Sequence, residues 1–202
     1  MDRLKRIWDS PYTFWALLAL PSAGMIMGAI DGAELKRLLH PTGEFAARFT
    51  ILAMMLTPLR MLFPASAAIS WLMRRRRHIG VAAFCYAALH LTFYILSRDG
   101  VAELLADAGK MRIWTGWIAF LIFVPLALTS NNLSIRRLGT AWKPIQRTVY
   151  VAAMALLAHW LMAKHGLVPA LLHFAPLAAL ESYRILRTMG FIVRSPHPQV
   201  SS

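Results

Sequence analysis

The sequence predicts an all-α membrane protein, built as a six-transmembrane-helix bundle with both termini cytoplasmic. Of its 202 residues, 58% are hydrophobic and only 15% are charged, which is more apolar than soluble domains of this length usually are. The net charge of +13 would suggest nucleic-acid binding in a soluble protein. Because the basic residues lie in the gaps between apolar stretches, no soluble domain remains to form a binding face, and we expect the lipid bilayer and no nucleic acid as partner.

Six stretches are predicted to cross the bilayer, which requires about 20 mostly apolar residues per helix. Within a single domain of residues 1–202, they cover about residues 12–30, 45–62, 78–96, 113–130, 148–163 and 167–183. Between them we expect a polar connector at 31–44, a short interfacial piece at 65–73 followed by four arginines, and an amphipathic surface helix within 98–112. No small-residue cleavage pattern follows the first apolar run, which is therefore interpreted as a span and not as a signal peptide.

The distribution of basic residues predicts how the bundle is oriented. Most of the 22 lysine and arginine residues fall on the side that holds both termini and Arg74–Arg77. Cytoplasmic loops carry the excess of basic residues in membrane proteins, so this side is assigned to the cytoplasm. The third and fifth spans then run in the same direction, from inside to outside.

Two histidines lie inside apolar stretches of these parallel spans, His90 in the third and His159 in the fifth. An ionisable ring at membrane depth is costly unless it has a partner or a ligand. At about 1.5 Å per residue, both lie roughly 18 Å from the cytoplasmic start of their helices. The two rings are therefore expected at the same depth, in the outer half of the membrane.

Two imidazoles at equal depth match the axial ligands of a haem, whose iron takes one nitrogen from each face of the macrocycle. Zinc or copper usually needs three or four ligands, and no carboxylate or second histidine lies one turn from either ring. We expect a haem between the third and fifth spans, with Tyr94 and Tyr150 among the aromatic residues at its edges. Either histidine alone would be more typical of a packing residue that bonds a neighbouring helix.

The order of several short motifs resembles the MsrQ (YedZ) family, within the ferric-reductase-like transmembrane group. The motifs cover most of the chain and follow in this order: His40-Pro41-Thr42-Gly43, Thr57-Pro58-Leu59-Arg60, Arg76-Arg77 with Gly80, Leu89-His90-Leu91 with Tyr94, Thr129-Ser130, Leu138-Gly139 with Trp142, Val149-Tyr150 and His159. The resemblance implies that His90 and His159 bind haem b. It also implies electron transfer across the bacterial inner membrane to a periplasmic molybdenum-containing reductase that repairs oxidised methionine. The chain would then be a redox subunit and not the catalytic subunit.

One position departs from the family pattern, because Gln146 stands where the family has a histidine. That histidine, thirteen residues before His159, would belong to a second haem in the inner half. The corresponding position before His90 holds Arg77 or Arg76, and neither a guanidinium nor an amide is a customary haem ligand. His78 is the remaining substitute. We therefore expect one firmly bound haem, in the outer half.

An electron must then reach the outer haem through another carrier. FMN or a quinone near the cytoplasmic loops is the natural candidate, supplied by a cytoplasmic flavin reductase or a membrane quinol. The chain itself carries no glycine-rich nucleotide motif.

Two other functions remain open at this point. One is a stand-alone transmembrane metal or quinone reductase, with His40, Asp99 and Glu103 at its outer mouth. The other is a haem-free scaffold or transporter in which the histidines pack or relay protons. The single cysteine, Cys85, excludes a disulfide within the chain.

Overall fold

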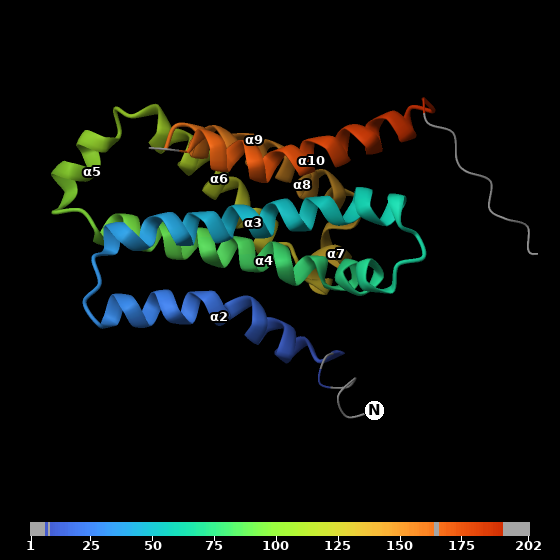
Figure 1. Cartoon of the computed structure of the whole chain (residues 1–202), viewed down its shortest axis with the longest axis horizontal. Helices are drawn as coiled ribbons and strands as arrows, with labels where there is room; N and C mark the ends of the chain where they lie inside the picture. The colour runs from blue at the N-terminus through green and yellow to red at the C-terminus, as the bar shows by residue number, and fades with distance from the viewer. Residues whose placement is uncertain (1–6, 8, 164–165, 192–202) are drawn as a thin grey trace, which may run out of the picture.

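Long helices run back and forth along one axis in this computed structural model, which describes residues 7, 9–163 and 166–191 (Figure 1). No strand occurs among these residues, and the all-α fold class is confirmed. The helices are α2 (Pro11–Ile30), α3 (Leu35–Leu62), α4 (Ala67–Leu96), α5 (Val101–Asp107), α6 (Met111–Leu128), α7 (Asn132–Leu138), the 3-10 turn η1 (Gly139–Ala141), α8 (Trp142–Arg147), α9 (Val149–Leu161) and α10 (Leu167–Thr188).

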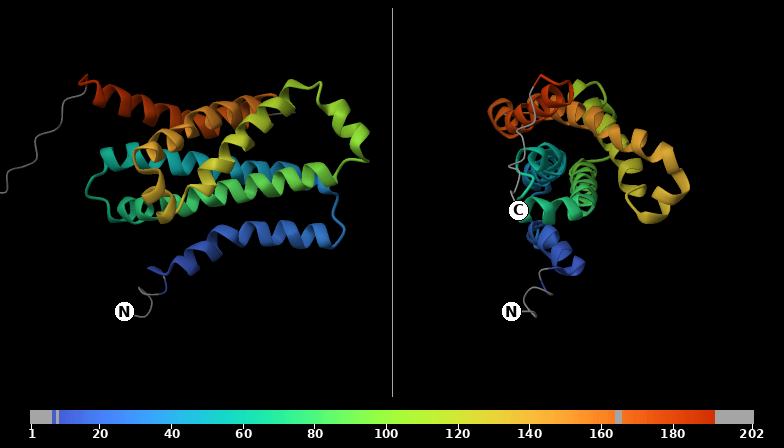
Figure 2. Two further views of the ribbon diagram at one scale, coloured as in Figure 1. Left: turned by 180° about the vertical axis from the view of Figure 1, so that it is seen from behind. Right: turned by 90° about the vertical axis from the view of Figure 1, so that its right-hand side faces the viewer.

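The antiparallel pair α3 and α4 forms the centre of the bundle (Figure 1). Helix α2 lies along one side of this pair, and α6, α9 and α10 lie along the other. The short helix α5 lies at one end of the bundle, here called the α5 end, and α7, η1 and α8 turn the chain at the opposite end, the α8 end. Figure 2 shows the α7–α8 segment, in yellow, projecting to one side. Because the long helices alternate in direction, α4 and α9 both run toward the α5 end, as predicted.

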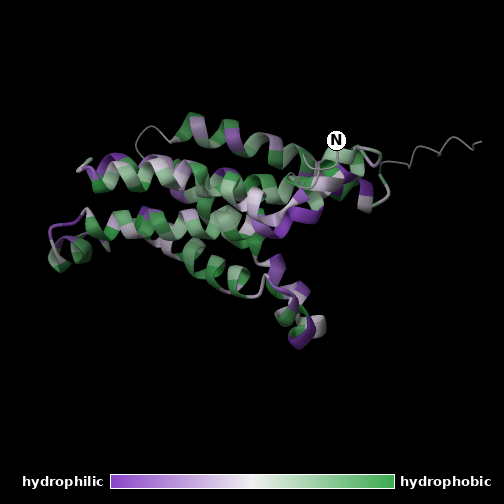
Figure 3. Ribbon diagram, turned by 90° about the horizontal axis from the view of Figure 1, so that it is seen from below, coloured by the Kyte–Doolittle hydropathy of each residue, from purple (hydrophilic) through white to green (hydrophobic). Residues whose placement is uncertain are grey.

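Four helices among the described residues are long and apolar enough to cross a membrane, namely α2, α3, α4 and α6. Their outer faces expose large apolar side chains, such as Leu20 on α2 and Leu121 on α6, which would be unfavourable in water. Figure 3 shows the hydrophilic residues mainly toward the ends of the bundle. Helix α9 has 13 residues, or about 20 Å, and is shorter than the roughly 30 Å hydrocarbon layer. The six-span count therefore stays a prediction.

Helix α3 begins earlier than expected, at Leu35, so the prediction of a polar connector over 31–44 was wrong from residue 35 onward. Pro41 lies inside this helix. A proline removes one backbone hydrogen bond and usually marks a helix boundary. The helix nevertheless continues through Pro41, and the next residue, Thr42, is fully buried with its hydroxyl 3.3 Å from Nδ1 of His90.

Helix α4 is continuous over 30 residues, so the separate interfacial piece predicted at 65–73 was also wrong. Arginine has a high helix propensity, and Arg74–Arg77 therefore do not interrupt the helix. Two of them are held by neighbours: Arg75 stacks over Trp71 with its guanidinium carbon 3.9 Å from the ring centroid, and Arg76 donates to the carbonyl of Ala53. The long helix keeps these cations at the α8 end of the bundle.

The remaining expected elements differ mainly at their ends. The fifth stretch, expected over about 148–163, is present as α9, which a turn at Thr148 separates from α8, and the sixth continues to Thr188. The surface helix predicted within 98–112 is present as α5. Five of the basic residues used for the orientation lie outside the described residues, namely Arg3, Lys5, Arg6, Lys164 and Arg194.

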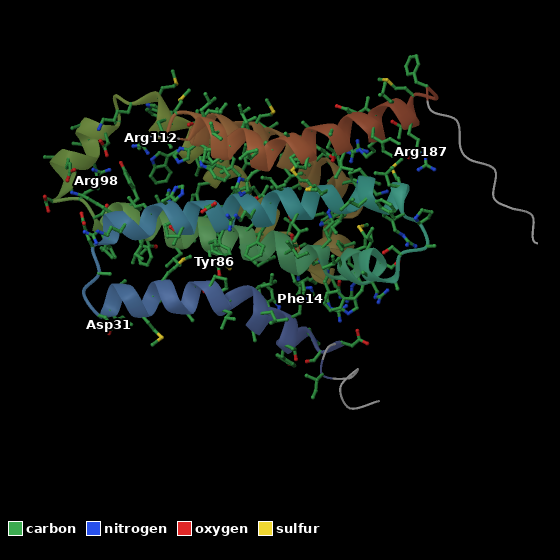
Figure 4. The ribbon with its side chains drawn as sticks, in the orientation of Figure 1. Phe14, Asp31, Tyr86, Arg98, Arg112 and Arg187 are labelled. Atoms are coloured by element: carbon green, nitrogen blue, oxygen red, sulfur yellow. The ribbon has the colours of Figure 1, made fainter. Side chains whose placement is uncertain are left out.

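The hydroxyl of Tyr86 attaches α2 to α4 (Figure 4). It donates to the carbonyl of Leu18 at 3.0 Å and accepts from the backbone N–H of Ser22 at 2.8 Å. The hydroxyl therefore bridges a backbone N–H and a backbone carbonyl of α2. This bridge lies beside Pro21, which has no backbone N–H to donate.

Candidate functional site

The rings of His90 and His159 lie next to each other near the α5 end, where α4 and α9 approach their C-terminal ends. Their centroids are 6.2 Å apart and the ring planes are nearly perpendicular, at 87°. The two histidines that the sequence placed at the same depth are thus brought together across the bundle.

Each ring donates a hydrogen bond to a backbone carbonyl of a third or fourth helix. Nδ1 of His90 bonds the carbonyl of Leu39 on α3 at 2.8 Å, and Nδ1 of His159 bonds the carbonyl of Arg112 on α6 at 2.7 Å. A carbonyl can only accept, so the proton must be on Nδ1 in both neutral rings. The lone pair of each Nε2 is then available for a metal, and a hydrogen bond on the opposite nitrogen is the usual support for a metal-binding histidine.

Both histidines line a cavity of about 330 Å³ between α3, α4, α6 and α9. The apolar part of its wall consists mainly of Leu39, Gly43, Ala46, Ala47, Ala87, Leu91, Ile113, Gly116, Trp117, Ala119, Phe120, Phe123, Leu156, Trp160 and Ala163. A cavity of this size with a largely apolar wall and a limited set of polar groups is typical of a small-molecule or cofactor site.

The distance between the two rings fits a single metal between them. With metal–nitrogen bonds of about 2 Å, two imidazoles on opposite sides of one metal have centroids roughly 6 Å apart. Among the described residues no group of three or more His, Cys, Asp or Glu side chains is placed to hold a metal ion. The donor set therefore suits a metal that brings its other ligands with it, as the iron of a haem does with four pyrrole nitrogens.

Two glycines leave the space that the rings occupy. A Cβ atom on Gly43 would lie 3.1 Å from Cε1 and Nδ1 of His90, and one on Gly116 would lie 2.9 Å from the same atoms of His159. A Cβ at Gly116 would force the ring of His159 to shift, whereas a Cβ at Gly43 would require His90 to give way by only a few tenths of an ångström. Glycine therefore favours the close approach of α3 to α4 and, more strictly, of α6 to α9.

Cationic side chains surround the mouth of the cavity at the α5 end. Lys36, Arg98 and Arg112 all line it, and Figure 4 shows Arg98 and Arg112 together at this end of the bundle. Arg98 is already paired with Glu103 at 2.7 Å and with Asp107 at 3.0 Å. No hydrogen bond or ion pair joins the side chains of Lys36 and Arg112 to another described residue, which leaves these two cations for an anionic ligand group.

A buried carboxylate, Asp107, connects α5 to this mouth. Its side chain accepts from Lys110 and from the hydroxyl of Tyr94, the latter at 2.8 Å, besides pairing with Arg98. The hydrogen bond from Lys110, followed by that from Tyr94, lowers the pKa of the Asp107 carboxyl below its usual value. Asp107 remains ionised and fixes α5 over the end of α4.

The two tyrosines of the predicted site lie in different places. Tyr94 lines the cavity, as expected. Tyr150 does not line it and instead packs beneath the guanidinium of Arg184, 5.4 Å from the ring centroid. It precedes His159 by about 14 Å along the helix, which is too far to reach the same cavity.

The residues considered for an inner site are not brought together. Arg77 donates to Asn132 at 2.7 Å, and Gln146 donates to the carbonyl of Leu126 and to the hydroxyl of Thr129. His78 faces α2, with its ring edge-on to Phe14 and Trp15 at centroid distances of 6.2 and 5.5 Å. None of these three side chains lines the cavity that holds His90 and His159.

Two of the outer-mouth residues considered for a stand-alone reductase, Asp99 and Glu103, contact each other before α5. Glu103 accepts from Arg98 and from the backbone N–H of Asp99, at 2.9 Å, and so closes the turn before α5. These two hydrogen bonds, that from Asp99 first, lower the pKa of the Glu103 carboxyl. His40 lines the cavity mouth beside Glu44, at 3.7 Å.

Sequence reasoning missed the supporting residues on α3 and α6, which are Leu39, Gly43, Arg112 and Gly116. A backbone carbonyl leaves no trace in a sequence. The glycines did carry a signal, because glycine inside a membrane helix often marks a close approach of another helix. Which helix approaches is decided by packing and is not visible in the pattern.

Comparisons with known proteins show the family of the chain. The family model of the ferric reductase like transmembrane component matches residues 42–157, a range that includes Gly43, His90 and Gly116 and ends just before His159. The chain is also similar to the protein-methionine-sulfoxide reductase heme-binding subunit MsrQ of Brucella ovis, Brucella canis and Brucella suis. It is 34% identical to each over 187 aligned residues, which cover 86% of this chain and 83% of the relative. No solved structure matches the chain.

Proposed function

Because the chain belongs to the MsrQ family of heme-binding subunits, within the ferric reductase like transmembrane proteins, we propose that it is the membrane electron-transfer subunit of a methionine-sulfoxide reductase system. It would pass electrons from a cytoplasmic or quinol donor to a periplasmic reductase through one haem b. The observation that supports this most directly is the facing pair His90 and His159, each with Nδ1 bound to a carbonyl and both lining one cavity.

The protein's own contribution is to hold and enclose the cofactor. His90 and His159 would hold the haem iron through Nε2, and the carbonyls of Leu39 and Arg112 fix the orientation of the rings. A bound haem supplies the redox chemistry, since its iron accepts and releases one electron at a time. The apolar wall keeps water from the metal, which affects the reduction potential.

Lys36 and Arg112 at the mouth are placed to bind the two propionates of the haem, which are anions. Arg98 is less available because Glu103 and Asp107 already neutralise it. The macrocycle would then lie in the apolar part of the cavity with its carboxylates toward the α5 end. Tyr94, tied to Asp107, would close the cavity beside the ring.

The orientation follows from charge. Basic residues gather at the α8 end, where Arg74–Arg77 and Arg187 lie, so this end is assigned to the cytoplasm of a bacterial inner membrane (Figure 4). With α9 and α10 as the fifth and sixth spans, both termini are cytoplasmic and the haem lies in the outer half. An electron on this haem is then close to the α5 end, where a periplasmic molybdenum-containing partner would dock.

The inner half of the electron path needs a second carrier. Gln146 bonds α6, Arg77 bonds Asn132 and His78 faces α2, so these three residues form no facing pair of ligands in the part of the chain that the structure describes. FMN or a membrane quinone is the carrier we propose, reduced by a cytoplasmic flavin reductase or by the quinol pool.

Haem titration of single-histidine variants tests this function. His90→Ala and His159→Ala, purified as full chains in detergent, are expected to lose the low-spin haem absorbance of the wild type. His40→Ala is the control, because His40 lines the same cavity but its side chain is 69% exposed. Normal haem spectra in both His90→Ala and His159→Ala would refute the proposed site.

A further inference from the structure

The dipeptide Thr-Gly occurs twice in this sequence, as Thr42-Gly43 and as Thr115-Gly116, and each copy lies beside one of the cavity histidines. Thr42-Gly43 is on α3 and faces His90 of α4. Thr115-Gly116 is on α6 and faces His159 of α9. The two copies belong to different helix pairs, so the contact in one pair is not a geometric consequence of the contact in the other.

The same atoms make the contacts in both copies. In each, the carbonyl three residues before the threonine accepts the histidine Nδ1–H and lies within hydrogen-bond distance of the threonine hydroxyl. For Leu39 the distances are 3.0 Å from Thr42 Oγ1 and 2.8 Å from His90, and for Arg112 they are 2.8 Å from Thr115 Oγ1 and 2.7 Å from His159. The glycine one residue later is the one that leaves room for the ring.

Helix geometry explains why these three positions act together. Residues three and four apart lie on one face of an α-helix, so the carbonyl, the hydroxyl and the bare Cα all meet the same neighbouring helix. The glycine admits the imidazole, and the carbonyl orients it. The threonine hydroxyl competes with the imidazole N–H for the same carbonyl oxygen.

We propose that Thr42-Gly43 and Thr115-Gly116 are positioning residues that seat the two histidines and raise the reduction potential of the cofactor between them. This inference rests on the proposed haem coordination by His90 and His159. A strong bond from Nδ1–H to a carbonyl gives the imidazole more negative charge and stabilises the oxidised metal, which lowers the potential. A hydroxyl bound to the same carbonyl weakens that bond, so its presence shifts the potential upward.

Thr115 gives the cleaner test of the two threonines. Thr42 Oγ1 also donates to the carbonyl of Leu38 and lies 3.3 Å from Nδ1 of His90, so its removal changes several contacts at once. Thr115 donates only to the carbonyl of Arg112 among the described residues.

Ordinary packing is the competing explanation, because membrane helices often contain small residues and threonines that bond back to their own helix. Thr50 is such a residue: it is buried on α3 and donates to the carbonyl of Ala46, and no histidine bonds that carbonyl. If packing were the whole role, Thr50→Val and Thr115→Val would affect stability alone. Only a role in tuning the ring changes a potential.

Redox titration of the haem-loaded full chain tests the threonine. Thr115→Val, which keeps the shape and removes the hydroxyl, is expected to retain haem and to have a lower midpoint potential than the wild type. Thr115→Ser restores the hydroxyl and is expected to restore the potential, and Thr50→Val is expected to leave it unchanged. An unchanged or raised potential in Thr115→Val, or an equal shift in Thr50→Val, overturns the inference.

Haem retention tests the glycines, with Gly80→Ala as the control because a Cβ at Gly80 meets nothing within 4 Å. Gly116→Ala is expected to lose most of its haem or to change its ferric spectrum, and Gly43→Ala less so, since the contact is 3.1 Å instead of 2.9 Å. Wild-type retention and spectra in Gly116→Ala contradict a seating role. If His90→Ala and His159→Ala lose haem while the Thr115 and Gly116 variants behave like the wild type, only this inference fails. If the two histidine variants keep their haem, the proposed function fails as well.

Discussion

The imidazole planes of His90 and His159 are turned by 87° relative to each other, with the ring centroids 6.2 Å apart. Their carbonyl partners explain the angle, because Leu39 lies on α3 and Arg112 lies on α6, so the two Nδ1–H bonds point to different helices. Rotation of either ring about its axial bond would break one of these hydrogen bonds. The perpendicular arrangement is therefore a property of the four-helix frame around the cavity.

This angle predicts the spectrum of the ferric haem. When axial imidazoles are perpendicular, the two metal d orbitals that bond to them remain nearly equal in energy, and the low-spin signal in electron paramagnetic resonance becomes strongly anisotropic. Parallel imidazoles separate these orbitals and give a less anisotropic, rhombic signal. We expect the strongly anisotropic type for the wild type in detergent and in lipid nanodiscs. A rhombic signal in both would contradict the ring geometry.

The cations at the cavity mouth predict an effect on cofactor affinity. Arg112→Gln removes a charge placed for a propionate but keeps the backbone carbonyl that bonds His159. Haem affinity, measured by titration of the apoprotein, is expected to fall roughly tenfold, as for the loss of one hydrogen bond to a charged group. Arg37→Gln is the matched control, since Arg37 is exposed at the same end and pairs with Glu34. Equal haem affinities of Arg112→Gln and the wild type would show that the Arg112 side chain does not bind a propionate.

The lowered pKa of Asp107 predicts how stability depends on pH. The folded protein holds the charged carboxylate more strongly than the unfolded chain does, where the pKa is near 3.8. Its contribution is therefore complete above about pH 4 and is lost as the pH falls through the lower folded pKa. Asp107→Asn is expected to lower the thermal unfolding midpoint by a few degrees at pH 7, and the gap to the wild type should narrow in acid.

Asp31→Asn provides the reference for that measurement, because Asp31 is an exposed carboxylate at the same end of the bundle (Figure 4). It is expected to change the midpoint little at any pH. A constant gap between Asp107→Asn and the wild type from pH 7 to pH 3 would show that the carboxylate charge is not what holds α5.

The histidine pair could be predicted from the sequence because helix length and depth in the membrane both follow from counting residues along the chain. Apolar run length placed the helices, and residue count from the cytoplasmic boundary placed His90 and His159 at one level. The support for these rings could not be predicted in this way, since it depends on which face of α3 meets α4 and on the register between them. Leu39 contributes only a backbone carbonyl, which every residue has.

The errors in the fold have related causes. The connector expected over 31–44 and the break expected at Arg74–Arg77 follow from the cost of polar and charged residues in a membrane. That cost is local, and α3 and α4 continue through both stretches. Arg76 donates to the carbonyl of Ala53, a partner that is distant in the sequence.

The inner half of the bundle predicts a single haem per chain. A pyridine haemochrome assay of the loaded wild type is expected to give one haem, because a second would need two facing ligands near the α8 end. Gln146→His supplies one imidazole at the position where the family has a histidine, and we expect the ratio to stay at one. On α4, Arg76 and Arg77 are held by Ala53 and Asn132. His78 faces α2, so no second ligand is turned toward residue 146. A ratio of two haems per chain in Gln146→His but not in the wild type would mean that a residue of α4 reorients to bind iron. A ratio of two in the wild type would mean that glutamine at position 146 does not exclude an inner haem.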